Sequence, residues 1–162
     1  PPATTNAGPG TFVGSDRCVA CHAGEARAWQ GSHHRRAMQP ASPASVLGNF
    51  ANARLAHGGI TTRFTQRNGH YFVTIDGPGG EPAEFEIRYT FGITPLQQYL
   101  VELPRGHVQA LPIAWDARPA SAGGQYWFHL YPQEQLRAGD PLHWTGYLQN
   151  WNFMCADCHS TN

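Results

Sequence analysis

The sequence contains no lysine. All eleven of its positive residues are arginine, and eleven aspartate and glutamate residues balance them. The chain therefore carries no net charge, which gives no electrostatic support for binding to nucleic acid or to an anionic membrane surface. No apolar run approaches the roughly 18–20 residues of a membrane-spanning helix. Charged residues make up only 14% of the chain, which favours association through neutral surfaces.

Cysteine is also scarce. The four cysteines all fall in two Cys-x-x-Cys-His segments, at residues 18–22 and 155–159. This spacing is the attachment pattern of a c-type haem, in which each thiol closes a thioether to a vinyl group and the following histidine becomes the proximal iron ligand. The sequence therefore predicts two covalently attached haem c groups. The expected attachment and proximal residues are Cys18, Cys21, His22, Cys155, Cys158 and His159.

Other uses of paired cysteines fit this sequence less well. The two pairs of a zinc ribbon usually lie about 15–20 residues apart, whereas nearly the whole chain separates these two. A thioredoxin-type pair follows a strand, but residues 14–16 before Cys18 read as a helix start. A disulfide framework would not place a histidine after both pairs.

Periodicity predicts short helices near both ends and a sheet between them. A first helix capped by Ser15 carries Cys18 to His22, and further short helices are expected at residues 25–36, 42–48 and 147–158. Between the third and the last of these helices, alternating apolar residues predict strands at 60–67, 70–76, 84–91, 96–103, 107–115 and 125–131. The expected fold class is α+β: a central antiparallel β meander, flanked by short helices and loops that carry the two haems.

The chain is expected to have two parts. Residues 1–11, which are polar and rich in proline and glycine, predict an extended N-terminal arm that is either a disordered tail or docks on a neighbour. Residues 12–162 form a single diheme domain with a β insert at about 60–131. Haem attachment of this kind takes place outside the cytoplasm, so we expect a periplasmic or extracellular protein whose signal peptide has already been removed.

Nine histidines are many for a chain of this length, and seven remain after the two proximal ligands. His33 and His34 lie close to the first haem motif and are natural sixth ligands of the iron. Met38 is the alternative, and it would raise the reduction potential.

Several stretches resemble a family of exported multihaem cytochromes c, which are often fused to tetratricopeptide repeats and are loosely related to the cytochrome c554 type. The likeness covers almost everything after residue 11. The resemblance implies electron transfer between periplasmic or extracellular partners through bis-histidine haems. The stretches include Gly31-Ser32-His33-His34, Tyr89-Thr90-Phe91-Gly92, residues 95–102, residues 140–146 and residues 150–162.

The resemblance also implies an order among the histidines. It favours His34 over His33 for the first haem and His143 over His129 for the second, although His129 could also be a propionate partner or a core residue. Family members usually continue beyond this length, so the chain is either a short diheme form or a processed fragment. Three tryptophans are expected to pack on the macrocycles: Trp29, Trp144 and Trp151.

The expected function is electron transfer rather than catalysis. The chain would be a diheme cytochrome that serves redox protein partners, and it would form the repeating subunit of a head-to-tail extracellular filament or else a monomer or small closed oligomer. The alternative is a periplasmic multihaem reductase, in which one haem with an open site acts on a small nitrogen oxide or a peroxide. A haem-based gas sensor would need an output domain, and none is seen in the sequence.

Overall fold

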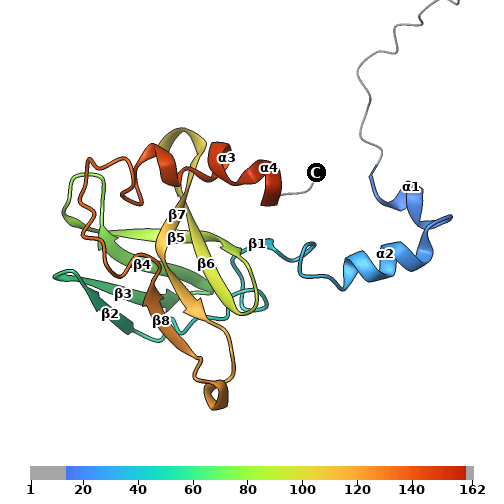
Figure 1. The fold of residues 1–162 in the computed structure, drawn as a ribbon, viewed down its shortest axis with the longest axis horizontal. Helices are drawn as coiled ribbons and strands as arrows, with labels where there is room; N and C mark the ends of the chain where they lie inside the picture. Colours follow the sequence, from blue (N-terminus) through green and yellow to red (C-terminus); the bar gives the residue numbers. More distant parts are fainter. Residues whose placement is uncertain (1–13, 160–162) are drawn as a thin grey trace, which may run out of the picture. The chain divides into compact units, whose positions relative to one another are not determined.

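The computed structural model describes residues 14–159 (Figure 1). Its internal contacts divide the chain into two units, residues 1–35 and 36–162, and each unit is described by itself. The arm expected at residues 1–11 lies outside the described residues.

The first unit consists of two short helices, α1 (Asp16–Val19) and α2 (Ala23–Gln30). Ser15 stands at the N-cap of α1, but its side chain makes no capping hydrogen bond. Helix α2 ends earlier than expected because the Ser32 hydroxyl donates to the Trp29 carbonyl at 2.6 Å and accepts from the Arg35 amide at 3.3 Å. His33 and His34 therefore lie in a turn after the helix.

The second unit is an antiparallel sheet in which strands follow one another in chain order, from β2 to β8. Only β1 departs from this order, because it pairs with β5. The meander predicted from the alternating pattern is thus confirmed. The strands are β1 (Met38–Pro40), β2 (Ala53–His57), β3 (Ile60–Arg67), β4 (His70–Asp76), β5 (Pro82–Phe91), β6 (Leu96–Leu103), β7 (His107–Asp116) and β8 (Tyr126–His129).

The fold class differs from the expected α+β arrangement. The chain is mostly β, with a nearly closed sheet and a few short helices. Strand β2 was not predicted, and the helix expected at residues 42–48 is a turn. In that turn the Ser45 hydroxyl accepts from the Ser42 amide at 2.9 Å and donates to the Pro40 carbonyl at 2.7 Å. These bonds satisfy the backbone without a helix.

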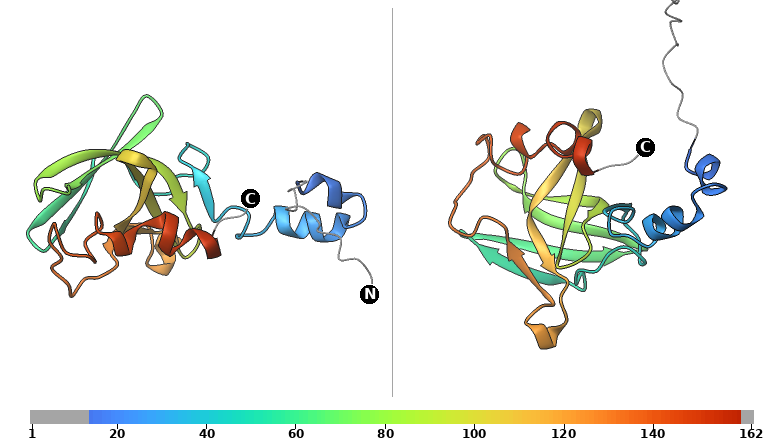
Figure 2. Two further views of the ribbon diagram at one scale, coloured as in Figure 1. Left: turned by 90° about the horizontal axis from the view of Figure 1, so that it is seen from above. Right: turned by 45° about the vertical axis from the view of Figure 1, so that its right-hand side comes forward.

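The two ends of the sheet lie close together, with β8 near β2 and β3 (Figure 2), and aromatic rings join them. Phe64 of β3 stacks on Trp127 of β8 with ring centroids 3.7 Å apart, and His57 of β2 stacks on His129 of β8 at 4.0 Å. The ends of the sheet are therefore joined through side chains, since β2 and β8 are not paired by backbone hydrogen bonds.

Gly48 brings the loop before β2 against this core. A Cβ at this position would lie 2.6 Å from the Tyr99 hydroxyl and 2.7 Å from Trp127, so a larger residue could not be accommodated without a shift. The Gly48 amide donates to the Tyr99 hydroxyl at 2.9 Å. The main core contains Phe50, Phe64, Tyr71, Val73, Ile75, Ile87, Tyr99, Val101, Leu111, Ile113, Trp115, Trp127 and Trp144.

The C-terminal stretch is broken into three short pieces rather than one helix over 147–158. They are the 3-10 turn η3 (Tyr147–Gln149), α3 (Trp151–Met154) and α4 (Ala156–His159). Two further 3-10 turns, η1 (Pro104–Gly106) and η2 (Ala120–Ala122), connect strands. Among residues 14–159, no helix has the length and apolarity needed to cross a membrane.

Candidate functional site

The two Cys-x-x-Cys-His segments adopt the same backbone turn. In the first, the amides of Cys21 and His22 both donate to the Cys18 carbonyl, at 3.2 and 2.9 Å. In the second, the amides of Cys158 and His159 donate to the Cys155 carbonyl at 3.2 and 3.0 Å. Residues four apart on such a turn share a face, so the first cysteine and the histidine of each segment face the same side.

The N-terminal segment is open to solvent. Cys18, Cys21 and His22 are exposed, and neither α1 nor α2 has a buried residue. Trp29 is 38% exposed, and the Arg35 guanidinium lies 5.6 Å from its ring centroid. Local hydrogen bonds and the contact between α1 and α2 therefore order this segment within its unit, without a buried core.

The C-terminal segment, by contrast, is docked on the sheet. The Trp151 side chain is 3% exposed and packs with Leu100 and Ala110 in a second core cluster, and α3 lies beside β7 (Figure 1). The Asn152 side chain accepts from the Val108 amide at 2.8 Å. Packing and hydrogen bonds thus hold this segment in place.

Gln109 of β7 is the polar centre of this docking. Its side-chain amide donates at 2.9 Å to the carbonyls of both Trp144 and Gly146, and its carbonyl accepts from the Asn150 side chain at 2.8 Å. Gln109 is 2% exposed and Asn150 is 4% exposed. A buried residue that satisfies three partners at once fixes the path of the chain into α3.

The docking changes the chemistry of the second segment. Burial raises the pKa of the Cys155 thiol, because an apolar environment disfavours the thiolate, whereas Cys158 is exposed. The His159 ring meets Phe91 edge-on at a centroid distance of 5.0 Å and lies 6.2 Å from Trp151. The aromatic rings of Phe91 and Trp151 therefore flank the His159 ring.

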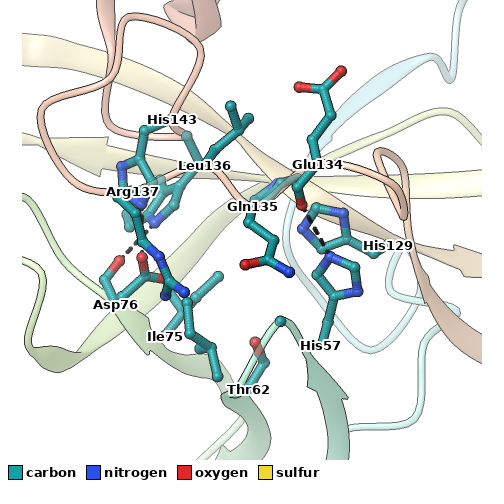
Figure 3. Close-up of a pocket in the computed structure, with 14 residues that line it drawn as sticks. His57, Thr62, Ile75, Asp76, His129, Glu134, Gln135, Leu136, Arg137 and His143 are labelled. Atoms are coloured by element: carbon teal, nitrogen blue, oxygen red, sulfur yellow. Dashed lines mark hydrogen bonds and ion pairs between the residues drawn. The ribbon is translucent and has the colours of Figure 1, made fainter.

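His143, which was expected to be the sixth ligand of the second haem, is engaged elsewhere. It is 3% exposed; its Nε2 lies 2.8 Å from Asp76 Oδ2 and its Nδ1 lies 2.8 Å from the Thr145 hydroxyl (Figure 3). Trp144 next to it donates to the Asp76 backbone carbonyl at 2.7 Å and belongs to the main core, whereas Trp151 belongs to the second cluster. The structure does not bring these two tryptophans together.

His129 also has a structural setting. Its Nδ1 accepts from the Tyr131 amide at 3.1 Å, and its ring stacks on His57. Burial is the main cause that lowers the pKa of His129, and the charge of His57 lowers it further. His33 and His34 are exposed in the first unit.

The prediction of two covalently attached haem c groups is contradicted. Across residues 14–159, no group of three or more histidine, cysteine, aspartate or glutamate side chains is placed to hold a metal ion. Both ring nitrogens of His143, the expected axial partner of His159, already have partners within the fold. The haem assignment is therefore withdrawn.

The roles of Asp76, Gln109 and Thr62 could not be seen in the sequence. Asp76 meets His143 across 67 residues of sequence, and Gln109 meets Asn150 across 41. No local pattern marks such partners, since each looks like an ordinary polar residue on a strand.

Comparisons of the chain with protein-family models, with curated proteins and with solved structures found no match.

Proposed function

We propose that this chain is an exported electron-transfer protein with one redox centre at each Cys-x-x-Cys-His segment. The observation that carries the proposal is the repetition itself. All four cysteines belong to two segments with the same pattern of backbone hydrogen bonds, in which the amide of the histidine donates to the carbonyl of the first cysteine. No cysteine is left over for a structural disulfide.

The accessibility of the thiols supports this function. Cys18, Cys21 and Cys158 are exposed, and only Cys155 is partly buried. A redox group must lie near the surface to exchange electrons with a partner protein, and thiol chemistry likewise depends on exposure. Both segments meet this requirement.

The partner surface lies beside the second segment. The side chains of Phe153 and Met154, next to Cys155, are 81% and 55% exposed, and Tyr147 is 70% exposed. Large apolar side chains in contact with water favour association. With no net charge on the chain, a second copy meets no net repulsion here, so contact between copies in a head-to-tail order is part of the proposal.

Protein-film voltammetry of the full chain, purified from the periplasm of an exporting host, tests the function. We expect two redox signals. The double variant Cys18→Ala/Cys21→Ala should lose one, and Cys155→Ala/Cys158→Ala should lose the other. The double variant Thr61→Val/Arg54→Gln, with both changes at exposed strand positions, is the control that should keep both signals.

Intact mass spectrometry of the same preparations identifies what each pair carries. A dithiol–disulfide couple changes the mass by two hydrogen atoms and passes two electrons, whereas a covalent group adds its own mass to a pair. Unmodified thiols with no redox signal would refute the proposal. Turnover of nitrite or hydrogen peroxide would instead favour an enzyme over an electron carrier. Size-exclusion chromatography that gives only monomers at all concentrations would refute contact between copies.

A further inference from the structure

A cavity in the second unit lies between the two ends of the sheet and the loop that follows β8. Its volume is about 50 Å³, which is room for about three or four non-hydrogen atoms. Much of its wall is apolar, and Ile60, Ile75, Pro112, Leu136 and Trp144 line it. The cavity is unrelated to the two cysteine segments, none of whose residues lines it.

Polar side chains without partners point into this apolar space. Thr62 is 5% exposed, yet within the described part of the chain its hydroxyl has no hydrogen-bond partner. The side chains of Gln135 and Arg137 on the loop also have no such partner among the described residues. Figure 3 shows the Thr62 hydroxyl and the Gln135 amide directed toward the same space. The Thr62 side chain is therefore held in a largely buried position, with its hydroxyl free to form a hydrogen bond with a group bound in the cavity.

The histidine pair adds a donor on one side of the cavity. Because His129 Nδ1 accepts from the Tyr131 amide, its proton is on Nε2 when the ring is neutral. The neighbouring His57 has its Nε2 at 3.4 Å from the Glu134 carbonyl, so it is tied to the loop. The lowered pKa of His129 keeps that ring neutral and an Nε2–H donor at pH 7.

Among the charged groups of the lining, the arginine has no partner within the described residues, whereas one carboxylate is engaged by a histidine and the other is turned away. Arg137 is the one permanent cation of the lining. Asp76 also lines the cavity, but it is held 2.8 Å from His143, and the Glu134 carboxylate points away from the space in Figure 3. A small ligand therefore meets unpaired donors and one free guanidinium, above an apolar floor, which is the usual make-up of a small-molecule site.

We propose that this cavity binds a small carboxylate of about the size of acetate, held by Thr62, Arg137 and His129. The two carboxylate oxygens of the ligand accept hydrogen bonds from the Thr62 hydroxyl and the Arg137 guanidinium. The short apolar end of the ligand contacts Ile75 and Trp144.

The test is a titration of the full chain with sodium acetate, followed by two-dimensional NMR at constant ionic strength, with sodium chloride as the reference salt. We expect saturable shifts of the Thr62 methyl and His129 ring signals with acetate and none of that kind with chloride. Linear shifts that are the same for both salts would overturn the proposal.

Variants separate a ligand site from a pocket that merely holds water. Thr62→Val keeps the volume and removes the hydroxyl, so we expect about tenfold weaker acetate binding, and Arg137→Gln should have an effect at least as large. The matched controls are Thr61→Val and Arg54→Gln at exposed positions on β3 and β2, which should bind as the wild type does. Wild-type affinity in both cavity variants, with the fold intact by NMR, would overturn the proposal.

Discussion

The two Cys-x-x-Cys-His segments have the same turn and opposite surroundings. Around Cys18 the hydrogen bonds are local and every helical residue is at least partly exposed. Around Cys155 the same turn follows a tryptophan that is 3% exposed and a buried network centred on Gln109. The difference shows that the motif itself specifies the turn, while the sheet specifies where the turn is held.

This contrast has an energetic meaning. A turn that only local bonds stabilise opens readily, because short isolated helices are marginal in water. A turn anchored by buried side chains opens only when the packing beneath it is lost. The two segments should therefore differ in stability and reactivity although their backbone hydrogen bonds agree, and three measurements test this difference.

The largest effect is expected from the tryptophans. Trp151→Ala removes a buried side chain and should lower the free energy of unfolding of the second unit by about 3–5 kcal/mol. Trp29→Ala, at a position that is 38% exposed, should change stability by less than about 0.5 kcal/mol. Urea denaturation followed by near-ultraviolet circular dichroism measures both. Equal effects of the two variants would show that the segments are not held differently.

A smaller effect is expected at Gln109. Gln109→Leu keeps the volume but leaves the carbonyls of Trp144 and Gly146 and the Asn150 amide without their partner, so we expect a loss of about 2–3 kcal/mol. Gln66→Leu, at an exposed position on β3, is the control. Hydrogen exchange should show faster exchange of the Cys155 amide in the Gln109 variant. Unchanged exchange would mean that the network does not position the segment.

The smallest effect is expected in thiol reactivity. Burial raises the pKa of Cys155, which lowers the fraction of this thiol that is thiolate at pH 7.5, so it should react with iodoacetamide more slowly than the exposed Cys18. The difference should shrink as the pH rises toward the pKa of Cys155. Timed alkylation with peptide mass spectrometry measures each rate on the reduced, unmodified chain. Equal rates for Cys155 and Cys18 at pH 7.5 would contradict the burial argument.

Much of the sheet could be predicted from local pattern. Residues 84–91 alternate between apolar and charged side chains, and they lie within β5. Asn68 and Gly69 have positive φ angles of 52° and 79° between β3 and β4, as an Asn-Gly hairpin requires. These features depend on residues that are close together in the sequence, so they can be predicted without knowledge of the fold.

The parts that could not be predicted depend on distant partners. Strand β2 is short and contains two alanines and an arginine, which gives little β propensity; its partners and the His57–His129 stack come from the closed sheet. The helix signature at residues 42–48 was overridden because Gln97 accepts from the Leu47 amide across 50 residues of sequence. The haem prediction used the spacing of the cysteines and could not take into account that Asp76 engages His143.

The ring stacks that close the sheet also bear on the order in which this unit folds. Each strand from β2 to β8 pairs with its neighbour in the sequence, so the meander can grow hairpin by hairpin with short loops to close. Phe64 and Trp127 must instead meet across most of the sheet. We therefore expect the contact between the two ends of the sheet to form last during folding and to break first during unfolding. The second unit would then open between β8 and the β2–β3 end of the sheet while its hairpins stay intact.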